Sequence, residues 1–240
     1  MQILSKQLTQ VLVRTIRSEA FQRAIPITRE SVIERGNQIL KKKGERFIIA
    51  DHQEEAVERL IKWYNPSSQF PIKQKNFMLL GNTGSGKSLL LKIFNDLSND
   101  WQHSTIIETQ SVALLFAKSG WTGDEVHNII HKHWDQDFPN NYSFEDIGRE
   151  EDSMHVVGNI PRSKMTNTFI QIFHQRHLLW ENKGIHTHGT TNLDKTELLS
   201  RYDQRTFSRM MGSTEFIPCG IKSDDRDFRI TPEISNEQGI

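Results

Sequence analysis

The chain of 240 residues has a single cysteine, Cys219, so no disulfide can form within it. One thiol in a chain of this length fits a reducing compartment. No stretch approaches the roughly 20 consecutive apolar residues that a membrane-spanning helix needs, and Met1 to Lys6 contain no apolar signal core. We therefore expect a protein that is neither in a membrane nor exported, and that resides in the cytoplasm.

Apolar residues are also scarce: they make up 35% of the chain, and charged residues make up 25%. This balance indicates much exposed helix surface. The length allows one α/β domain with a sizeable core and a smaller appendage. Net charge is zero, but residues 1–46 hold 10 Lys and Arg against 4 Asp and Glu. Such a segment could bind nucleic acid or an acidic protein surface, or be a solvated helix face.

The N-terminal part of the chain has the apolar spacing of helices. We expect helices over residues 1–25, 28–40 and 53–63. Thr28 is the expected N-cap of the second helix, which ends near Gly44. Pro66 and the two serines after it mark a linker. We therefore divide the chain into a small helical N-terminal region, residues 1–70, and a main domain, residues 71–240.

From Lys75 onward, short apolar segments alternate with helical patterns. Strands are expected at 76–80, 105–108, 141–146, 185–190 and 215–218. Helices are expected at 87–96, 111–118, 123–134 and 165–182, with two consecutive helices over 194–211. Strands separated by helices favour an α/β fold, with a parallel sheet and helices on both of its faces. Ligands of such sheets bind at the carboxyl ends of the strands.

A glycine-rich loop follows the first expected strand. Its residues fit the pattern that binds nucleotide phosphates in a strand–loop–helix context: Gly81, Asn82, Thr83, Gly84, Ser85, Gly86, Lys87 and Ser88. The glycines let backbone N–H groups face phosphate oxygens, and the following helix N-terminus adds positive charge. Lys87 would reach the β- and γ-phosphates, and the Ser88 hydroxyl would bind Mg²⁺. The loop therefore predicts a P-loop ATPase with ATP and magnesium as cofactors.

Polar residues end two later strands. Glu145 and Asp146 close the third strand, where P-loop ATPases hold magnesium and orient the attacking water. Asn192 follows the fourth strand and could contact the γ-phosphate or that water, or simply belong to a strand-to-helix turn. Glu150 and Glu151 are interpreted as loop acids.

An arginine supplied by a neighbouring subunit can stabilise the charge that develops on a γ-phosphate. The candidates are Arg201, Arg205, Arg209 and Arg226. Arg205 and Arg209 are four residues apart, on one helix face, where arginines are also common as plain surface residues.

Two pairs of histidines could suggest a metal site: His131 with His133, and His186 with His188. Neither pair has a cysteine nearby or a third ligand at zinc spacing. We therefore expect no metal other than magnesium.

Taken together, these residues resemble the DnaC-like bacterial helicase loaders, which are AAA+ ATPases, and their relatives, the helper ATPases of insertion-sequence transposition. The resemblance covers residues 76–226. It rests on five blocks, GNTGSGKS at 81–88, FEDIGRE at 144–150, THGTTNL at 187–193, RYDQRTFSRM at 201–210 and DDR at 224–226. The P-loop combined with Asn192-Leu193 after the fourth strand and with the block at 201–210 is much more specific than the P-loop alone.

The resemblance assigns roles to individual residues. Lys87 and Ser88 match Walker A, Glu145 and Asp146 match Walker B, Asn192 matches sensor 1, Arg209 matches the arginine finger with Arg205 as its close partner, and Arg226 matches sensor 2. The acidic pair of the family is usually Asp-Glu or Asp-Asp. The shorter Asp146 would hold a water farther from the γ-phosphate, so hydrolysis would be slow. Tyr202-Asp203 also replaces the usual Tyr-Gly.

The resemblance further implies a DNA replication protein that hydrolyses ATP and self-associates on single-stranded DNA. Arg209 of one subunit would act in trans on the ATP of the next, and residues 1–70 would bind a replicative DNA helicase. Lys118 is a candidate DNA contact. The alternatives are a transposition helper that coats duplex DNA and recruits a transposase, and a small-molecule kinase, which would explain the P-loop but not Asn192 and the arginine block.

Overall fold

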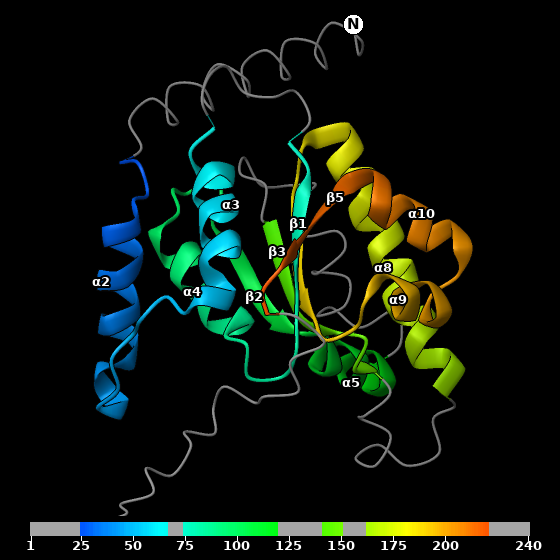
Figure 1. The fold of residues 1–240 in the computed structure, drawn as a ribbon. Coiled ribbons are helices and arrows are strands. Elements are labelled where there is room, and N and C mark those ends of the chain that lie inside the picture. The colour runs from blue at the N-terminus through cyan, green and yellow to red at the C-terminus, as the bar shows by residue number, and fades with distance from the viewer. Residues whose placement is uncertain (1–24, 67–73, 120–140, 151–161, 221–240) are drawn as a thin grey trace, which may run out of the picture.

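The computed structural model describes residues 25–66, 74–119, 141–150 and 162–220 (Figure 1). The helices expected at 1–25 and 123–134, the histidine pair at 131 and 133, and Arg226 lie outside these residues. Across the four described stretches, no helix combines the length and the apolar character that crossing a bilayer requires.

A five-stranded parallel sheet forms the centre of the described structure. Its strands are β1 (Asn76–Leu80), β2 (Ser104–Glu108), β3 (Asn141–Ile147), β4 (Thr187–Thr191) and β5 (Thr214–Pro218). The order across the sheet is β2-β3-β4-β1-β5, and every neighbouring pair is parallel. Met78 of β1 pairs with Gly189 on one side and Phe216 on the other. The predicted parallel α/β sheet is thereby confirmed.

Helices cover both faces of this sheet (Figure 1). On one side lie α2 (Arg29–Leu40), α3 (Glu54–Tyr64) and α4 (Lys87–Leu97), with short 3-10 turns η1 (Lys41–Lys43) and η2 (Asp51–Gln53). On the other side lie α5 (Thr109–Ser119), α8 (Arg162–Lys183), α9 (Lys195–Arg201) and α10 (Gln204–Ser213). The predicted helices in the described stretches are present, with ends shifted by a few residues at most.

Each side of the sheet has its own hydrophobic core. The first core contains buried residues of α2, α3, β1 and α4, among them Val32, Leu60, Phe77 and Leu90. The second contains buried residues of β3, α8, α9 and α10, among them Phe144, Ile172, Leu198 and Met210. Helices α2 and α3 therefore pack against the strand and helix that flank the glycine-rich loop. The assignment of residues 1–70 as a partner-binding region stays a prediction.

The start and end of α2 follow from local chemistry. The Thr28 hydroxyl accepts a hydrogen bond from the Ser31 backbone N–H, and the Ser31 hydroxyl accepts one from the N–H of Thr28. This reciprocal cap satisfies two N–H groups that the helix itself cannot bond. At the other end, Gly44 adopts a left-handed backbone with φ of 71°, which glycine tolerates without steric cost.

His188, on the central strand β4, lies in a cluster of aromatic rings. Its ring stacks on Phe77 with a centroid distance of 3.9 Å, and the Trp63 ring meets it edge-on. Its Nδ1 accepts a hydrogen bond of 3.2 Å from the Phe77 backbone N–H. Burial lowers the pKa of His188 well below its usual value, and the neighbouring His186 adds to the effect. The His186 and His188 rings stack on each other with a centroid distance of 5.5 Å. Within the described residues no cluster of His, Cys, Asp and Glu could hold a metal ion.

The burial of His188 predicts a pH-dependent stability. The unfolded chain binds a proton on this side chain below about pH 6.5, whereas the folded chain resists it, so stability is lost as pH falls through that region. His188→Asn retains an acceptor for the Phe77 N–H and removes the titration. In urea denaturation, its free energy of unfolding should change less between about pH 7.5 and pH 5.5 than that of the wild type. Equal slopes for His188→Asn and the wild type would contradict a role of buried His188 in this pH dependence.

Candidate nucleotide-binding site

The glycine-rich loop joins the carboxyl end of β1 to the start of α4. Gly84 and Gly86 adopt left-handed backbone conformations, with φ of 84° and 87°. At Gly81 an added Cβ would lie 2.0 Å from the backbone oxygen of Cys219, so no larger residue fits there. The loop therefore curls back over the strand end and leads directly into the N-terminus of α4, as a phosphate-binding loop requires.

Lys87 lies across this loop with its ammonium group held by oxygen atoms. Its Nζ donates hydrogen bonds to the backbone oxygens of Gly81 and Asn82, at 2.7 and 2.8 Å. It also donates to Oδ1 of Asn192 at 2.8 Å. The side chain is buried, and these acceptors are neutral, as is the Ser85 hydroxyl, to which Nζ donates at 3.3 Å. A phosphate placed at the loop would offer this buried cation a charged partner, which makes a stronger hydrogen bond than a neutral acceptor.

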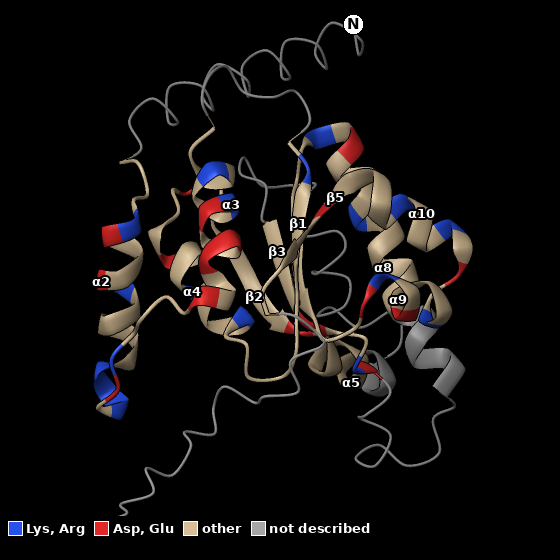
Figure 2. Cartoon of the chain, in the orientation of Figure 1, with Lys and Arg blue, Asp and Glu red and all other residues tan. Residues whose placement is uncertain are grey.

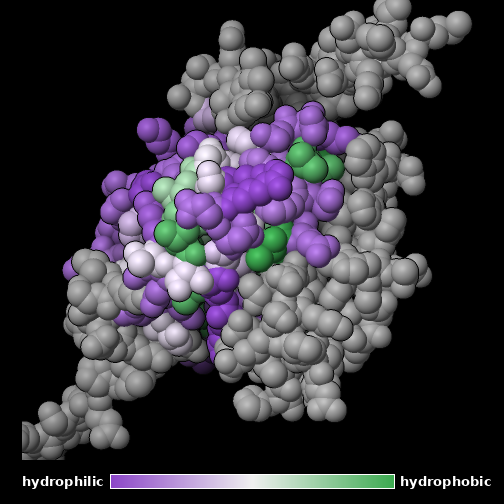
Figure 3. Space-filling view, turned by 90° about the vertical axis from the view of Figure 1, so that its right-hand side faces the viewer, coloured by the Kyte–Doolittle hydropathy of each residue, from purple (hydrophilic) through white to green (hydrophobic). Residues whose placement is uncertain are grey.

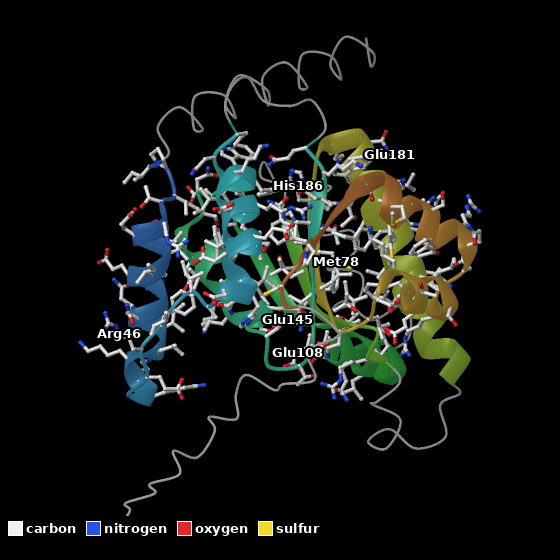
Figure 4. The ribbon with its side chains drawn as sticks, viewed as in Figure 1. Arg46, Met78, Glu108, Glu145, Glu181 and His186 are labelled. Atoms are coloured by element: carbon white, nitrogen blue, oxygen red, sulfur yellow. The ribbon has the colours of Figure 1, made fainter. Side chains whose placement is uncertain are left out.

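Ser88 and Glu145, the predicted magnesium ligands, are adjacent in the structure. The Ser88 side chain lies close enough to the Glu145 carboxylate to lower the pKa of Glu145. Burial raises the pKa of Glu145, and the carboxylates of Asp146 and Glu108 add repulsion. Figure 4 shows Glu145 and Glu108 together at the carboxyl end of the sheet. A hydroxyl beside a half-buried, repelled carboxylate is a donor set that suits Mg²⁺, which takes few protein ligands and completes its shell with phosphates and water.

Asp146 lies at an irregularity in β3. The register of β3 with β4 shifts between Phe144 and Ile147, and Asp146 has a left-handed φ of 54°. Aspartate adopts this conformation more readily than most residues. The Asp146 N–H donates to the Thr190 hydroxyl at 3.0 Å, and its carboxylate lies 3.6 Å from an Arg149 guanidinium nitrogen. The carboxylate of Asp146 therefore points toward Arg149 in the loop that follows β3.

The end of β4 is tied to the end of β3 beside Asn192. The Thr191 hydroxyl donates to the backbone oxygen of Ile147 at 2.7 Å and accepts from the Leu193 N–H at 3.0 Å. These bonds fix the backbone on both sides of Asn192 and direct its amide oxygen toward Lys87. The structure therefore places Asn192 in contact with Lys87 of the loop. The catalytic and binding roles of these residues stay predictions.

Two contacts to the loop come from η2 and were missed in the sequence. The Gln53 amide donates to the Ser85 backbone oxygen at 2.9 Å, and the His52 ring lies 3.4 Å from the same oxygen. An added Cβ at Gly86 would lie 2.2 Å from Gln53 Nε2, so a side chain there would displace the Gln53 amide. No local pattern indicates this contact, since the partners are 32 positions apart.

The arginines predicted to act on the γ-phosphate, Arg205 and Arg209, lie away from the P-loop of their own chain. Arg205 and Arg209 belong to α10, which is on the opposite side of the sheet from α4 (Figures 1 and 2). Among the described residues, neither side chain makes a hydrogen bond or an ion pair. Arg201 instead contacts Glu150. The chain therefore does not bring Arg205 or Arg209 to its own Lys87.

The face that carries α10 is largely hydrophilic (Figure 3). Its exposed apolar side chains come from three helices: Leu178 in α8, Leu199 in α9 and Met211 in α10. Polar side chains separate the apolar patches in this view.

Comparisons with known proteins match this fold to solved structures. The crystal structure of the DnaC helicase loader has a TM-score of 0.52 at 15% identity, covering 71% of this chain and 91% of that chain. DnaI gives 0.49 at 20% identity, covering 73% of this chain and 86% of that one. AMPPCP-bound DnaA from Aquifex aeolicus gives 0.48 at 18% identity, covering 71% and 48%. No protein-family model matches the chain, and no curated protein does. The likeness is one of fold: the chain shares the parallel α/β fold of the DnaC helicase loader structure.

Proposed function

We propose that this chain is an ATP-binding and ATP-hydrolysing AAA+ protein that assembles on single-stranded DNA and loads a replicative helicase. The observation that carries the proposal is the position of Lys87. It lies between the oxygens of the P-loop and Asn192 from a different strand. A γ-phosphate bound there would be in reach of both residues, so one site would bind the nucleotide and detect its terminal phosphate.

The residues of the site divide the work of hydrolysis. The loop N–H groups and Lys87 bind the phosphates, while Ser88 and Glu145 hold Mg²⁺. When bound, the metal neutralises charge on the β- and γ-phosphates. Asp146 orients the attacking water, and its short side chain makes turnover slow. Asn192 holds the γ-phosphate oxygen or that water in place.

Self-association completes the site. Developing charge on the γ-phosphate needs a cation on the side away from the P-loop. The α10 arginines of the same chain lie across the sheet from α4, whereas an adjoining subunit could present its own α10. This placement supports Arg209 acting in trans, with Arg205 beside it.

The partners are proposed from the fold and from charge. The crystal structure of the DnaC helicase loader shares this fold, which supports a replicative helicase as the protein partner, with residues 1–70 as the contact. Single-stranded DNA would be bound by lysines and arginines along the assembled subunits, including Lys118 of α5. The proposed setting is the cytoplasm.

Nucleotide-gated DNA binding tests this function. Fluorescence anisotropy should show that the ATP-bound protein binds a labelled single strand at least about tenfold more tightly than the duplex of the same sequence, with affinity that falls steeply as salt rises. ADP in place of ATP should weaken the binding, because assembly depends on the γ-phosphate. A preference for duplex would favour a transposition helper, and no DNA binding with either nucleotide would overturn the proposal.

A further inference from the structure

Glu150 is a buried carboxylate just past the acidic pair. Its side chain is 1% exposed. Oε1 accepts hydrogen bonds from the Gly148 N–H at 3.0 Å and from the Tyr202 hydroxyl at 2.7 Å. Oε2 lies 3.4 Å from two guanidinium nitrogens of Arg201. Burying a charged group is costly unless it is paired and hydrogen-bonded, so Glu150 ties these three residues together.

On one side, Glu150 is attached to the nucleotide site. Gly148 follows Asp146 by two residues and has a left-handed φ of 103°. An added Cβ at Gly148 would lie 2.5 Å from Leu193 Cδ1, so the loop after β3 packs directly on the segment after Asn192. With the bond from Thr191 to the Ile147 oxygen, the ends of β3 and β4 form one rigid unit to which Glu150 is bonded.

On the other side, Glu150 is attached to the start of α10. Arg201 is the last residue of α9, Tyr202 follows it, and Asp203 caps α10 by accepting from the Thr206 N–H at 2.9 Å. Tyr202 is buried, and burial followed by the charge of Glu150 raises the pKa of its phenol well above the usual value. The phenol therefore remains a hydrogen-bond donor to Glu150 at neutral pH.

We propose that Glu150 is a positioning residue that fixes α10, and with it Arg209, relative to the nucleotide site of the same subunit. The inference rests on the proposed function, in which Arg209 acts on the nucleotide of a neighbouring subunit. A change at the ends of β3 and β4 when nucleotide binds would then move α10. The movement would alter the position of Arg209 at the nucleotide site of the neighbouring subunit. Loss of the Glu150 contacts should therefore impair the site of the neighbour and spare the site of the subunit that carries the change.

Mixing two inactive proteins separates these effects. A Lys87→Ala protein lacks its own nucleotide site but keeps its α10 arginines, so it is the donor. An Arg209→Ala protein keeps its nucleotide site but has no arginine to give, so it is the acceptor. ATP turnover recovered in the mixture arises at acceptor P-loops completed by donor subunits. Glu150→Gln, which keeps the shape of the side chain, or Tyr202→Phe, which removes one hydroxyl, is then placed in either protein.

Placed in the donor, each change should lower the recovered turnover about tenfold, which is within the range of coupling seen inside one hydrogen-bond network. Placed in the acceptor, each change should leave the recovered ATP turnover within about twofold of that of the unmodified mixture. Thermal melts of all four double variants identify any that fail to fold, and the other substitution then decides. Equal losses in the two placements, or no loss in either, overturn the inference but not the proposed function. No recovered turnover in the unmodified donor–acceptor mixture overturns both.

Discussion

An Arg209→Ala protein is expected to lose ATP turnover by about 10³-fold, the effect typical of a missing arginine finger, while keeping its affinity for ATP. The reason is geometric, since α10 and α4 lie on opposite sides of the sheet. Arg209 therefore contributes to the rate at a neighbouring P-loop and not to nucleotide binding at its own. Turnover per subunit should be measured at rising protein concentration, because assembly should raise the wild-type rate and leave the variant rate low.

A matched control for this experiment is Arg46→Ala. Arg46 is exposed and lies on the α2 side of the molecule, away from α10 (Figure 4). Its loss should leave turnover and its concentration dependence unchanged. If Arg209→Ala turned over ATP as fast as the wild type wherever the wild type assembles, the arginine would not act in trans.

A Lys87→Ala protein is expected to bind ATP about 100-fold more weakly, because it loses hydrogen bonds from a buried cation to phosphate oxygens. The loop loses the bonds from Lys87 to the Gly81 and Asn82 oxygens but keeps the bond from Gln53 to the Ser85 oxygen. Isothermal titration calorimetry with ATP and magnesium measures the loss of affinity directly.

The control for Lys87→Ala is Lys62→Ala, at an exposed lysine of α3. It removes the same charge from the chain but should leave the affinity unchanged. Wild-type affinity in Lys87→Ala would mean that the nucleotide, if bound at all, is bound elsewhere, and the proposed site would have to be abandoned.

Much of the fold was predictable because its signals are local. The cap at Thr28 depends on a hydroxyl three residues from the N–H that it bonds. The strand at 76–80 is a short apolar run that ends at a glycine, and the structure places β1 there. Alternation of such runs with helical patterns is enough to predict a parallel sheet. The order of the strands is not local information and was not predicted.

The parts of the site that escaped prediction depend on contacts between distant residues. Gln53 reaches the P-loop across 32 positions, and Tyr202 reaches Glu150 across 52. The sequence alone favours a loop acid at Glu150, which stands between Arg149 and Glu151. Its burial follows only once α9 and α10 pack over the end of β3. The left-handed backbone of Asp146 likewise arises from the register shift between β3 and β4.

The position of β1 between β4 and β5 has a consequence for synthesis of the chain. Phe77 and His188, which bond across β1 and β4, are 111 positions apart, and β5 is made later still. Contacts this distant form slowly, and a growing chain cannot make them until both partners exist. On the ribosome, the P-loop residues are therefore synthesised long before the two strands that pair with β1, the strand leading into the loop. A nascent chain that stops before Thr187 carries all eight loop residues and neither of the strands that pair with β1.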